Sequence, residues 1–291
     1  MSNTDDEKRR LQAETNRKLG SQVPRWAWDS VVSIVLSSKR ALYQFATGSL
    51  FQVADQQFVV TAAHSLRIAA VYGKTIVISC GSDSFMSPSG DWICSAPFQY
   101  GSVEDPLDIA VYRIPDELVA RFNRQRFIQL SEVNFDVLPS GVFVLFAYPG
   151  IWAAPSRSDD EKLKIKPLEY TAIAYSRDLA AVEGYQPKLH ILLDADSKEI
   201  TLSDGSRTEL RKGDGSQAVF PKDLKGISGC PVWLVGDQRV PIGDWQSLPV
   251  GLAGVQTGVF QESGAITVTR WIAVTTLIHE AFPELRCVLT I

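Results

Sequence analysis

The chain of 291 residues is long enough for one large domain or two of ordinary size, and a hydrophobic content of 45% is enough to build a core. The net charge of −4 and the mixture of acidic and basic residues argue against a nucleic-acid-binding protein, which needs a basic surface to neutralise phosphates. No run reaches about 18 uninterrupted apolar residues, so no membrane partner is expected.

Residues 1–29 are predicted to be a helical extension. Thr4 and Glu7 have the spacing of a capping box, and Gly20 ends the helical pattern, which predicts a surface helix over residues 4–20. We expect a solvated extension, and the alternative is a helix that docks a protein partner. Charges stand where an export signal needs an apolar core, so a cytoplasmic location is expected.

From Ser30 the pattern changes to short apolar runs rich in Val, Ile, Phe and Tyr, separated by turn residues, which predicts an all-β protein. The first set of strands is expected at 31–36, 41–53, 56–64, 74–80 and 108–114, within a first unit that spans 30–135. Residues 114–140 are irregular enough to be a linker, with a short helix at 115–122.

A second unit is expected over 136–291, with strands at 141–150, 168–176, 188–196, 198–210, 231–236, 250–258 and 265–274. Asp204-Gly205 is expected to form a tight turn, and the charged segment 157–167 is expected to be an exposed loop. Residues 275–282 have helical spacing, and Pro283 stops that helix.

Four cysteines, Cys80, Cys94, Cys230 and Cys287, lack any CxxC spacing and are expected to be free thiols. The alternative is a bridge between Cys80 and Cys94 across a hairpin.

Three short stretches carry groups that could act together. His64 follows an apolar strand, Asp108 opens an alternating one, and Ser228 lies between two glycines in the loop 226–231. The histidine alone is more typical of a structural residue and the acid alone of a turn. A serine between glycines is different, because the glycines allow positive φ and let consecutive amides point at one spot. A serine hydroxyl also needs a base, and that base needs an acid, which are the groups that His64 and Asp108 supply.

The order of three short motifs along the chain resembles that of the trypsin/chymotrypsin-like serine peptidases, especially their bacterial branch. The motifs are TAAH at 61–64, DIAV at 108–111 and GISGCP at 226–231, and they are supported by ATGSLF at 46–51, AYPG at 147–150 and GVQTG at 254–258. The resemblance covers roughly residues 30–282, and its strength lies in the joint order of weak motifs.

The resemblance implies two six-stranded antiparallel barrels with a short C-terminal helix, and a catalytic cleft between the barrels. His64 and Asp108 would come from the first barrel and Ser228 from the second. The amides of Gly226 and Ser228 would form the oxyanion hole. Lys222 would lie at the floor of the specificity pocket and favour an acidic or polar side chain, although a solvated loop lysine is an equal alternative.

The resemblance also places Gln256, Thr257 and Gly258 at the pocket wall, where they would bind substrate backbone by strand addition. No metal or organic cofactor is implied. His190 and His279 have no partner signature, so structural roles are expected for both.

Two residues depart from the family pattern. Ile227 replaces the aspartate that pairs with a freed amino terminus in trypsin, so activation by that route is not expected. Cys230 replaces a glycine, is expected to be a buried structural thiol rather than the nucleophile, and could distort the oxyanion loop. The separation of 120 residues between Asp108 and Ser228 is longer than in trypsin. We attribute the extra length to insertions near 157–167 and near Asp204.

The sequence therefore predicts a serine endopeptidase that cleaves polypeptides through an acyl-enzyme intermediate. The alternative is a peptidase-like binding module that keeps the cleft but cleaves weakly or not at all.

Overall fold

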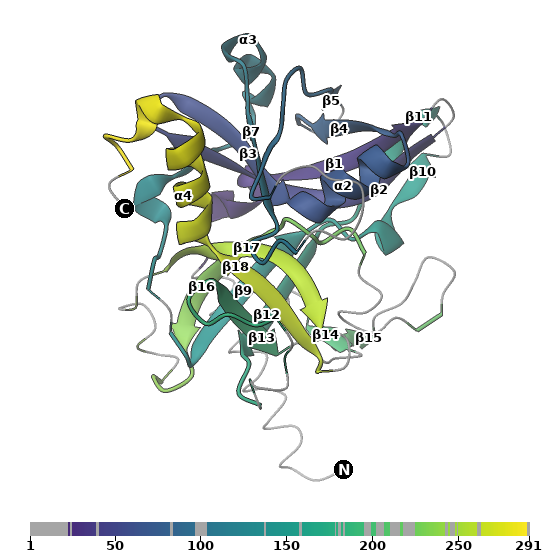
Figure 1. The fold of residues 1–291 in the computed structure, drawn as a ribbon. Helices are drawn as coiled ribbons and strands as arrows, with labels where there is room; N and C mark the ends of the chain where they lie inside the picture. The colour runs from purple at the N-terminus through teal and green to yellow at the C-terminus, as the bar shows by residue number, and fades with distance from the viewer. Residues whose placement is uncertain are drawn as a thin grey trace.

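The structure is a computed structural model in two β-rich halves (Figure 1). It describes residues 23–289 apart from 24, 39–40, 82–83, 97–103, 137, 157–158, 178, 180–181, 183, 195–198, 202–206, 210–215, 218–224, 242–243, 245–247, 249 and 261–262. The predicted helix over 4–20 and the predicted Asp204-Gly205 turn lie outside the described residues.

The first half is one sheet with the strand order β5-β4-β1-β2-β3-β7-β6, all paired antiparallel, with β8 added parallel to β2. Its strands are β1 (Val31–Ser38), β2 (Ala41–Val53), β3 (Gln56–Ala62), β4 (Thr75–Ser79), β5 (Phe85–Met86), β6 (Ile93–Cys94), β7 (Ile109–Arg113) and β8 (Ile128–Gln129). Its helical segments are η1 (Arg25–Ser30), α2 (Ala63–Val71), α3 (Asp116–Val119), η2 (Ala120–Phe122) and η3 (Leu130–Glu132).

The second half contains a closed barrel in which β12, β13, β18, β17, β16 and β9 follow one another. These strands are β9 (Gly141–Ala147), β12 (Leu168–Ala174), β13 (His190–Asp194), β16 (Pro231–Asp237), β17 (Gly251–Phe260) and β18 (Ala265–Arg270). The remaining elements are η4 (Gly150–Trp152), β10 (Ala154–Ser156), β11 (Asp159–Lys164), β14 (Glu199–Thr201), β15 (Arg207–Glu209), α4 (Trp271–Ala281) and η7 (Pro283–Leu285).

Strand β9 shows why a barrel strand can be one continuous apolar run. Side chains of a strand alternate between its two faces. In β9, Phe143 and Leu145 face the interior cluster of the barrel, whereas Val142, Val144 and Phe146 join a second cluster that extends into the first half. Both faces are therefore dry, which explains why GVFVLFA has no polar residue.

The C-terminal helix α4 joins the two halves (Figure 1). Its first residue, Trp271, is fully buried, and its ring centroid lies 5.1 Å from that of Phe51 on β2 in an edge-to-face contact. Burying an aromatic side chain of this kind stabilises the fold by roughly 1.5–3 kcal/mol. The helix thus fixes the first half against the barrel, and the site described below lies where the halves meet.

The predicted fold class is confirmed: the protein is mostly β, with a chymotrypsin-like arrangement and a C-terminal helix. The second half closes into six strands as expected, whereas the first half is an open sheet within the described residues. The predicted insertions form the separate hairpins β10–β11 and β14–β15.

Three local predictions need correction. Residues 157–167 are not only loop, because β11 occupies Asp159–Lys164 and pairs with β10. The strand expected over 265–274 ends at Arg270, where α4 begins, since its last residues, WIAV, fit a buried helix face as well as a strand. The linker 114–140 contains β8, which pairs with β2.

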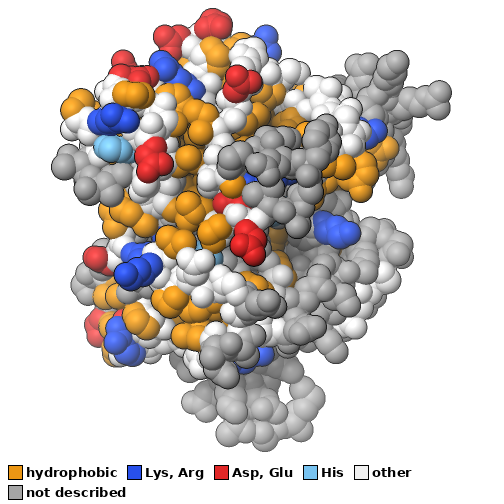
Figure 2. All heavy atoms as spheres, viewed as in Figure 1, with side chains coloured by type: hydrophobic (Ala, Val, Ile, Leu, Met, Phe, Trp, Pro, Cys, Tyr) orange, Lys and Arg blue, Asp and Glu red, His pale blue; other side chains and the backbone are white. Residues whose placement is uncertain are grey.

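Figure 2 shows one face of the molecule, on which Lys and Arg side chains are interspersed with acidic ones. Among the described residues visible there, the basic side chains form no continuous stripe. Within the described part of the chain, no helix is both long and apolar enough to cross a membrane.

Candidate active site

His64 is placed by the end of a buried strand. Strand β3 carries Ala62 as its last residue, and the chain turns there directly into α2, so that His64 is the second residue of the helix. The flanking Ala62 and Ala63 are fully buried, which anchors the turn, while the imidazole side chain remains 36% exposed. The backbone of His64 is therefore anchored by buried neighbours, while its side chain stays accessible to solvent.

Asp108 lies just before β7 and has a φ of 49°, in the left-handed region that few residues other than glycine adopt. In this conformation the Asp108 carboxylate contacts His64 through both of its oxygens. Oδ1 accepts a hydrogen bond from the His64 backbone N–H at 2.7 Å, and Oδ2 lies 2.5 Å from His64 Nδ1. Nδ1 therefore carries the proton that points at the acid, and Nε2 is left to accept another.

The serine loop crosses from the second half to touch the first. The Thr47 N–H on β2 donates to the carbonyl of Ser228 at 2.9 Å, and the Thr47 hydroxyl donates to the carbonyl of Gly226 at 2.8 Å. Gly229 has a φ of +90°, and a Cβ there would lie 2.1 Å from the Thr47 carbonyl oxygen. Glycine is required because the backbones of the serine loop and of β2 lie too close together here for any side chain to fit.

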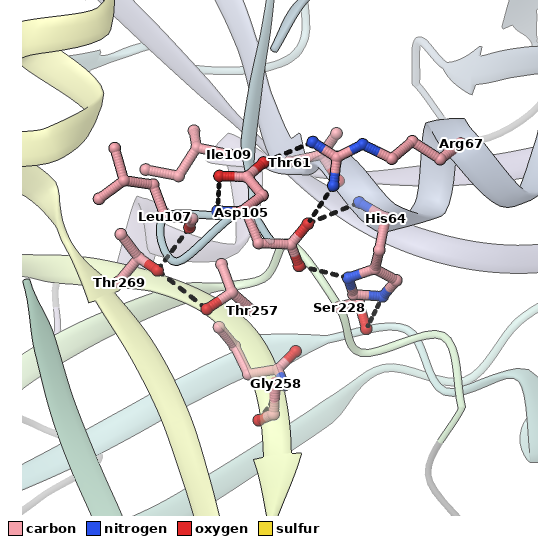
Figure 3. A network of polar contacts seen from close by, with 12 residues as sticks. Thr61, His64, Arg67, Asp105, Leu107, Ile109, Ser228, Thr257, Gly258 and Thr269 are labelled. Atoms are coloured by element: carbon pink, nitrogen blue, oxygen red, sulfur yellow. Dashed lines mark hydrogen bonds and ion pairs between the residues drawn. The ribbon is translucent and has the colours of Figure 1, made fainter. Parts of the chain in front are cut away.

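These elements bring the three predicted groups together. His64 Nε2 lies 3.1 Å from Ser228 Oγ, so the serine hydroxyl can donate to the imidazole while the imidazole donates to Asp108 (Figure 3). The side chain of Asp108 is 17% exposed and that of His64 is 36% exposed, so water reaches the carboxylate less than it reaches the imidazole. The arrangement suits proton transfer from a hydroxyl to an imidazole whose cation is stabilised by a carboxylate.

The amides of Gly226 and Ser228 were predicted to form an oxyanion hole. Gly226 has a φ of +97°, and neither amide donates a hydrogen bond to any residue that the structure describes. The neighbouring amides are engaged, since Gly229 N–H donates to the Gln256 carbonyl at 2.7 Å and Cys230 N–H to the Ile227 carbonyl at 3.0 Å. The oxyanion hole stays a prediction, and the described residues leave these two amides without a bonding partner.

The two departures from the family pattern are both buried in the barrel core. Ile227 and Cys230 are 2% and 0% exposed and belong to the same apolar cluster. Burial raises the pKa of the Cys230 thiol, so it stays protonated at neutral pH, as a structural thiol should. All four cysteines are free, and the alternative bridge between Cys80 and Cys94 is not formed.

The predicted substrate-binding residues on β17 are in different environments. Gln256 is 1% exposed, donates from Nε2 to the Gly258 carbonyl at 2.9 Å, and leaves its Oε1 without a partner. The Thr257 hydroxyl contacts that of Thr269 at 2.9 Å, and Gly258 is half-buried. Lys222 lies outside the described residues, so its role at a pocket floor stays a prediction.

Four further residues hold the segment that precedes Asp108, and the sequence analysis did not assign them this role. Arg67 and Asp105 form an ion pair at 2.5 Å (Figure 3). His190 Nε2 donates to the Pro106 carbonyl at 2.5 Å, and the Thr269 hydroxyl donates to the Leu107 carbonyl at 2.7 Å. The only sequence signal was spacing, because Arg67 and Asp105 each lie three residues from a predicted catalytic residue.

The structural role expected for His190 agrees with its burial, and its contact with Pro106 additionally links the barrel to the loop of Asp108. His279 lies in the last turn of α4, away from the site. Within the described residues, no group of three or more His, Cys, Asp or Glu side chains could hold a metal ion.

No known family and no curated protein matches this chain in sequence. Among solved structures, a thermostable serine protease, AL20, from an extremophilic microorganism is 12% identical, with a TM-score of 0.47, over 87% of this chain and 96% of its own. The scabies mite inactivated protease paralogue S-I1 is 13% identical, with a TM-score of 0.47, over 89% and 98%.

A mutant of human heparin binding protein (CAP37) is 12% identical, with a TM-score of 0.49, over 90% of this chain and 93% of its own. At these values the similarity concerns the path of the chain and decides nothing about activity. The barrel, the facing sheet, and the meeting of His64, Asp108 and Ser228 between them make this chain a protein of chymotrypsin-like fold.

Proposed function

We propose that the chain is a serine endopeptidase that uses Ser228 as nucleophile, His64 as general base and acid, and Asp108 as the group that orients His64. The observation that carries this proposal is the pair of contacts around one imidazole, 2.5 Å to the Asp108 carboxylate and 3.1 Å to the Ser228 hydroxyl. A serine is activated when its hydroxyl lies within hydrogen-bond reach of a base that a third group orients.

In this mechanism Ser228 Oγ attacks the carbonyl carbon of the scissile peptide bond, and its proton moves to His64 Nε2. Asp108 accepts the hydrogen bond from Nδ1–H and stabilises the imidazolium without taking the proton. His64 then returns the proton to the leaving amine, which breaks the peptide bond and leaves an ester on Ser228. Water, deprotonated by the same imidazole, hydrolyses that ester and restores the serine.

The tetrahedral intermediate needs donors for its negative oxygen. The amides of Gly226 and Ser228 supply two, and the positive φ of Gly226 is the local geometry that supports this role. Loss of one such donor costs about 3 kcal/mol in enzymes that use it, so this backbone geometry would make a substantial contribution to catalysis. The substrate would be an extended polypeptide that pairs with β17 near Gly258.

The alternative is a binding module that holds peptides without cutting them. Cys230 was the main reason to suspect a distorted loop, and its burial in the barrel core, with Cys230 N–H donating to the Ile227 carbonyl in a regular turn, supports the enzyme instead.

A peptide library incubated with the wild type and with Ser228→Ala tests the proposal. We expect the wild type to release new peptide termini and Ser228→Ala to release none, with both proteins folded. Binding of library members by both proteins without cleavage would favour the module.

A further inference from the structure

A buried ion pair lies next to the His64–Asp108 contact and joins the same two segments of the chain. Helix α2 carries His64 and, three residues later, Arg67, while one loop carries Asp105 and, three residues later, Asp108. The side chains of Arg67 and Asp105 are 14% and 3% exposed. The helix and the loop are therefore joined twice, once through the proposed catalytic residues and once through this buried pair.

Three groups donate hydrogen bonds to the carboxylate of Asp105. Arg67 Nη2 donates at 2.5 Å, Ser95 Oγ lies 2.8 and 2.9 Å from the two carboxylate oxygens, and the Asp108 backbone N–H donates to Oδ1 at 3.0 Å. Burial alone would raise the pKa of Asp105, but the hydrogen bonds from Arg67, Asp108 and Ser95 outweigh it and lower that pKa. Asp105 is therefore a carboxylate at neutral pH and brings a full charge to the site.

Asp108 needs this support because of its backbone. A left-handed φ in a residue other than glycine costs about 1 kcal/mol or more and persists only when the surroundings fix it. The Asp108 N–H is held by Asp105, and the Asp108 carbonyl accepts from Ala63 N–H at 2.9 Å. The carbonyls of Pro106 and Leu107 are held by His190 and Thr269 of the barrel. Asp105 thus supplies the bond that holds the N–H of the strained residue.

We propose that Arg67 and Asp105 are positioning residues for the proposed peptidase: Asp105 holds Asp108 in its left-handed conformation, and Arg67 balances the charge of the two carboxylates that it contacts, Asp105 and Asp108. This inference rests on the proposed function, and nothing in the family resemblance assigns either residue.

The charges around the imidazole are consistent with this role. Arg67 Nη1 lies 3.6 Å from Asp108 Oδ1, so one guanidinium is shared by two carboxylates, the closer being Asp105. Cys94 on β6 lies near the Arg67 guanidinium and both carboxylates. Burial raises the pKa of its thiol to about 11, so the thiol is neutral. His190 reaches the loop through the Pro106 carbonyl. Removing Arg67 would leave two like charges and raise the proton affinity of His64, whereas removing the charge of Asp105 would lower it.

The test is the pH dependence, from pH 5 to 9, of the rate at which a fluorophosphonate labels Ser228 in Arg67→Met, Arg67→Lys and Asp105→Asn. We expect the midpoint of the acid limb to rise by about 0.5 pH unit in Arg67→Met and to fall by a similar amount in Asp105→Asn, because the two changes have opposite signs. Arg67→Lys keeps the charge and should hold the midpoint within about 0.2 pH unit. The plateau rate should fall about tenfold in Arg67→Met and Asp105→Asn, since displacement of Asp108 misplaces the base.

Arg177→Met is the matched control, because Arg177 pairs with Asp194 at 2.7 Å on the barrel surface. It should change neither midpoint nor plateau. Folded Arg67→Met and Asp105→Asn with unchanged midpoints, or with shifts in the same direction, would overturn the inference. If Asp105→Asn does not fold, the two Arg67 variants decide, because Arg67→Met must shift and Arg67→Lys must not.

A wild type that is not labelled at all would contradict the proposed function rather than this inference. In that case the titration of the His64 ring, followed by NMR in the same variants, reports the charge balance without any catalysis. Opposite shifts in Arg67→Met and Asp105→Asn would still support the inference.

Discussion

The imidazole of His64 lies 3.1 Å from the hydroxyl of Ser228, although 164 residues of chain separate the two. The contact depends on two backbones that touch across the halves, since the N–H of Thr47 donates to the carbonyl of Ser228 at 2.9 Å. Packing between these two main-chain segments therefore fixes the position of the serine hydroxyl relative to the imidazole.

Gly229→Ala should destabilise the protein by about 2–4 kcal/mol and abolish labelling of Ser228. The new Cβ would lie 2.1 Å from the Thr47 carbonyl oxygen and 2.2 Å from Thr61 Oγ1, so the serine loop must move away from β2. Urea unfolding measures the loss. Gly73→Ala is the control, because Gly73 also has a positive φ, +57°, but a Cβ there meets nothing within 4 Å. It should cost only about 1 kcal/mol, and equal losses in both variants would contradict the steric argument.

Thr269→Val should weaken the joint between the barrel and the loop of Asp108. The variant keeps the shape of the side chain but removes the hydroxyl that bonds the Leu107 carbonyl at 2.7 Å and the Thr257 hydroxyl at 2.9 Å. Leaving such buried groups without a partner costs about 1–3 kcal/mol.

Thermal or urea unfolding measures the effect of Thr269→Val, with Thr276→Val as its control. Among the described residues, the Thr276 hydroxyl bonds only the Ile272 carbonyl within α4, so the free energy of unfolding should fall by no more than about 0.5 kcal/mol. A stability equal to wild type in Thr269→Val would show that this bond does not hold the loop.

The native protein should react with iodoacetamide at Cys287 and resist at the other thiols. Burial raises the pKa of Cys94 to about 11 and raises that of Cys230 further, so neither forms a thiolate at pH 7.5. Cys80 is buried, whereas Cys287 is exposed. Mass spectrometry after brief alkylation locates the adducts. Rapid alkylation of Cys230 would contradict its place in the core and reopen the question of a cysteine nucleophile.

Acid should destabilise the protein partly through His190. Burial lowers the pKa of His190, although its bond to the Pro106 carbonyl opposes that effect. The Gln186 N–H occupies Nδ1 at 3.1 Å, so the folded protein holds the neutral ring. An unfolded histidine titrates near about 6.5, so between that value and the lower folded one the unfolded chain binds the extra proton. Stability should therefore fall as the pH drops below about 6.5.

The midpoint of thermal unfolding between pH 5 and 7 measures this dependence. His190→Gln should show a smaller loss of stability over the same range than the wild type. Identical slopes in the two proteins would exclude His190 as the source.

The sequence carried enough information for most strands and for the meeting of the three candidate groups. Short apolar runs mark β2 and β3, and the motifs that contain His64, Asp108 and Ser228 each lie next to a strand end. The structure brings the three side chains within hydrogen-bond reach of one another. The positive φ of Gly226 and Gly229 agrees with the expectation from sequence, whereas the close approach of Gly229 to Thr47 was not predicted.

Other features depend on contacts that spacing alone does not reveal. The sequence carries no sign that Arg67 has a partner, because Asp105, with which it pairs, lies 38 residues later in the chain. The strand β11 is highly charged and lacks the apolar alternation by which strands are recognised. The end of β18 at Arg270 was missed because an apolar run of four residues fits a strand and a helix equally well.

The most direct test of the central claim is mass spectrometry of the wild type and of His64→Ala after treatment with a fluorophosphonate. The account predicts one adduct per chain, on Ser228, and a labelling rate at least about 1,000-fold lower in His64→Ala. A folded wild type that carries no adduct on Ser228, or a His64→Ala protein labelled as fast as the wild type, would contradict it.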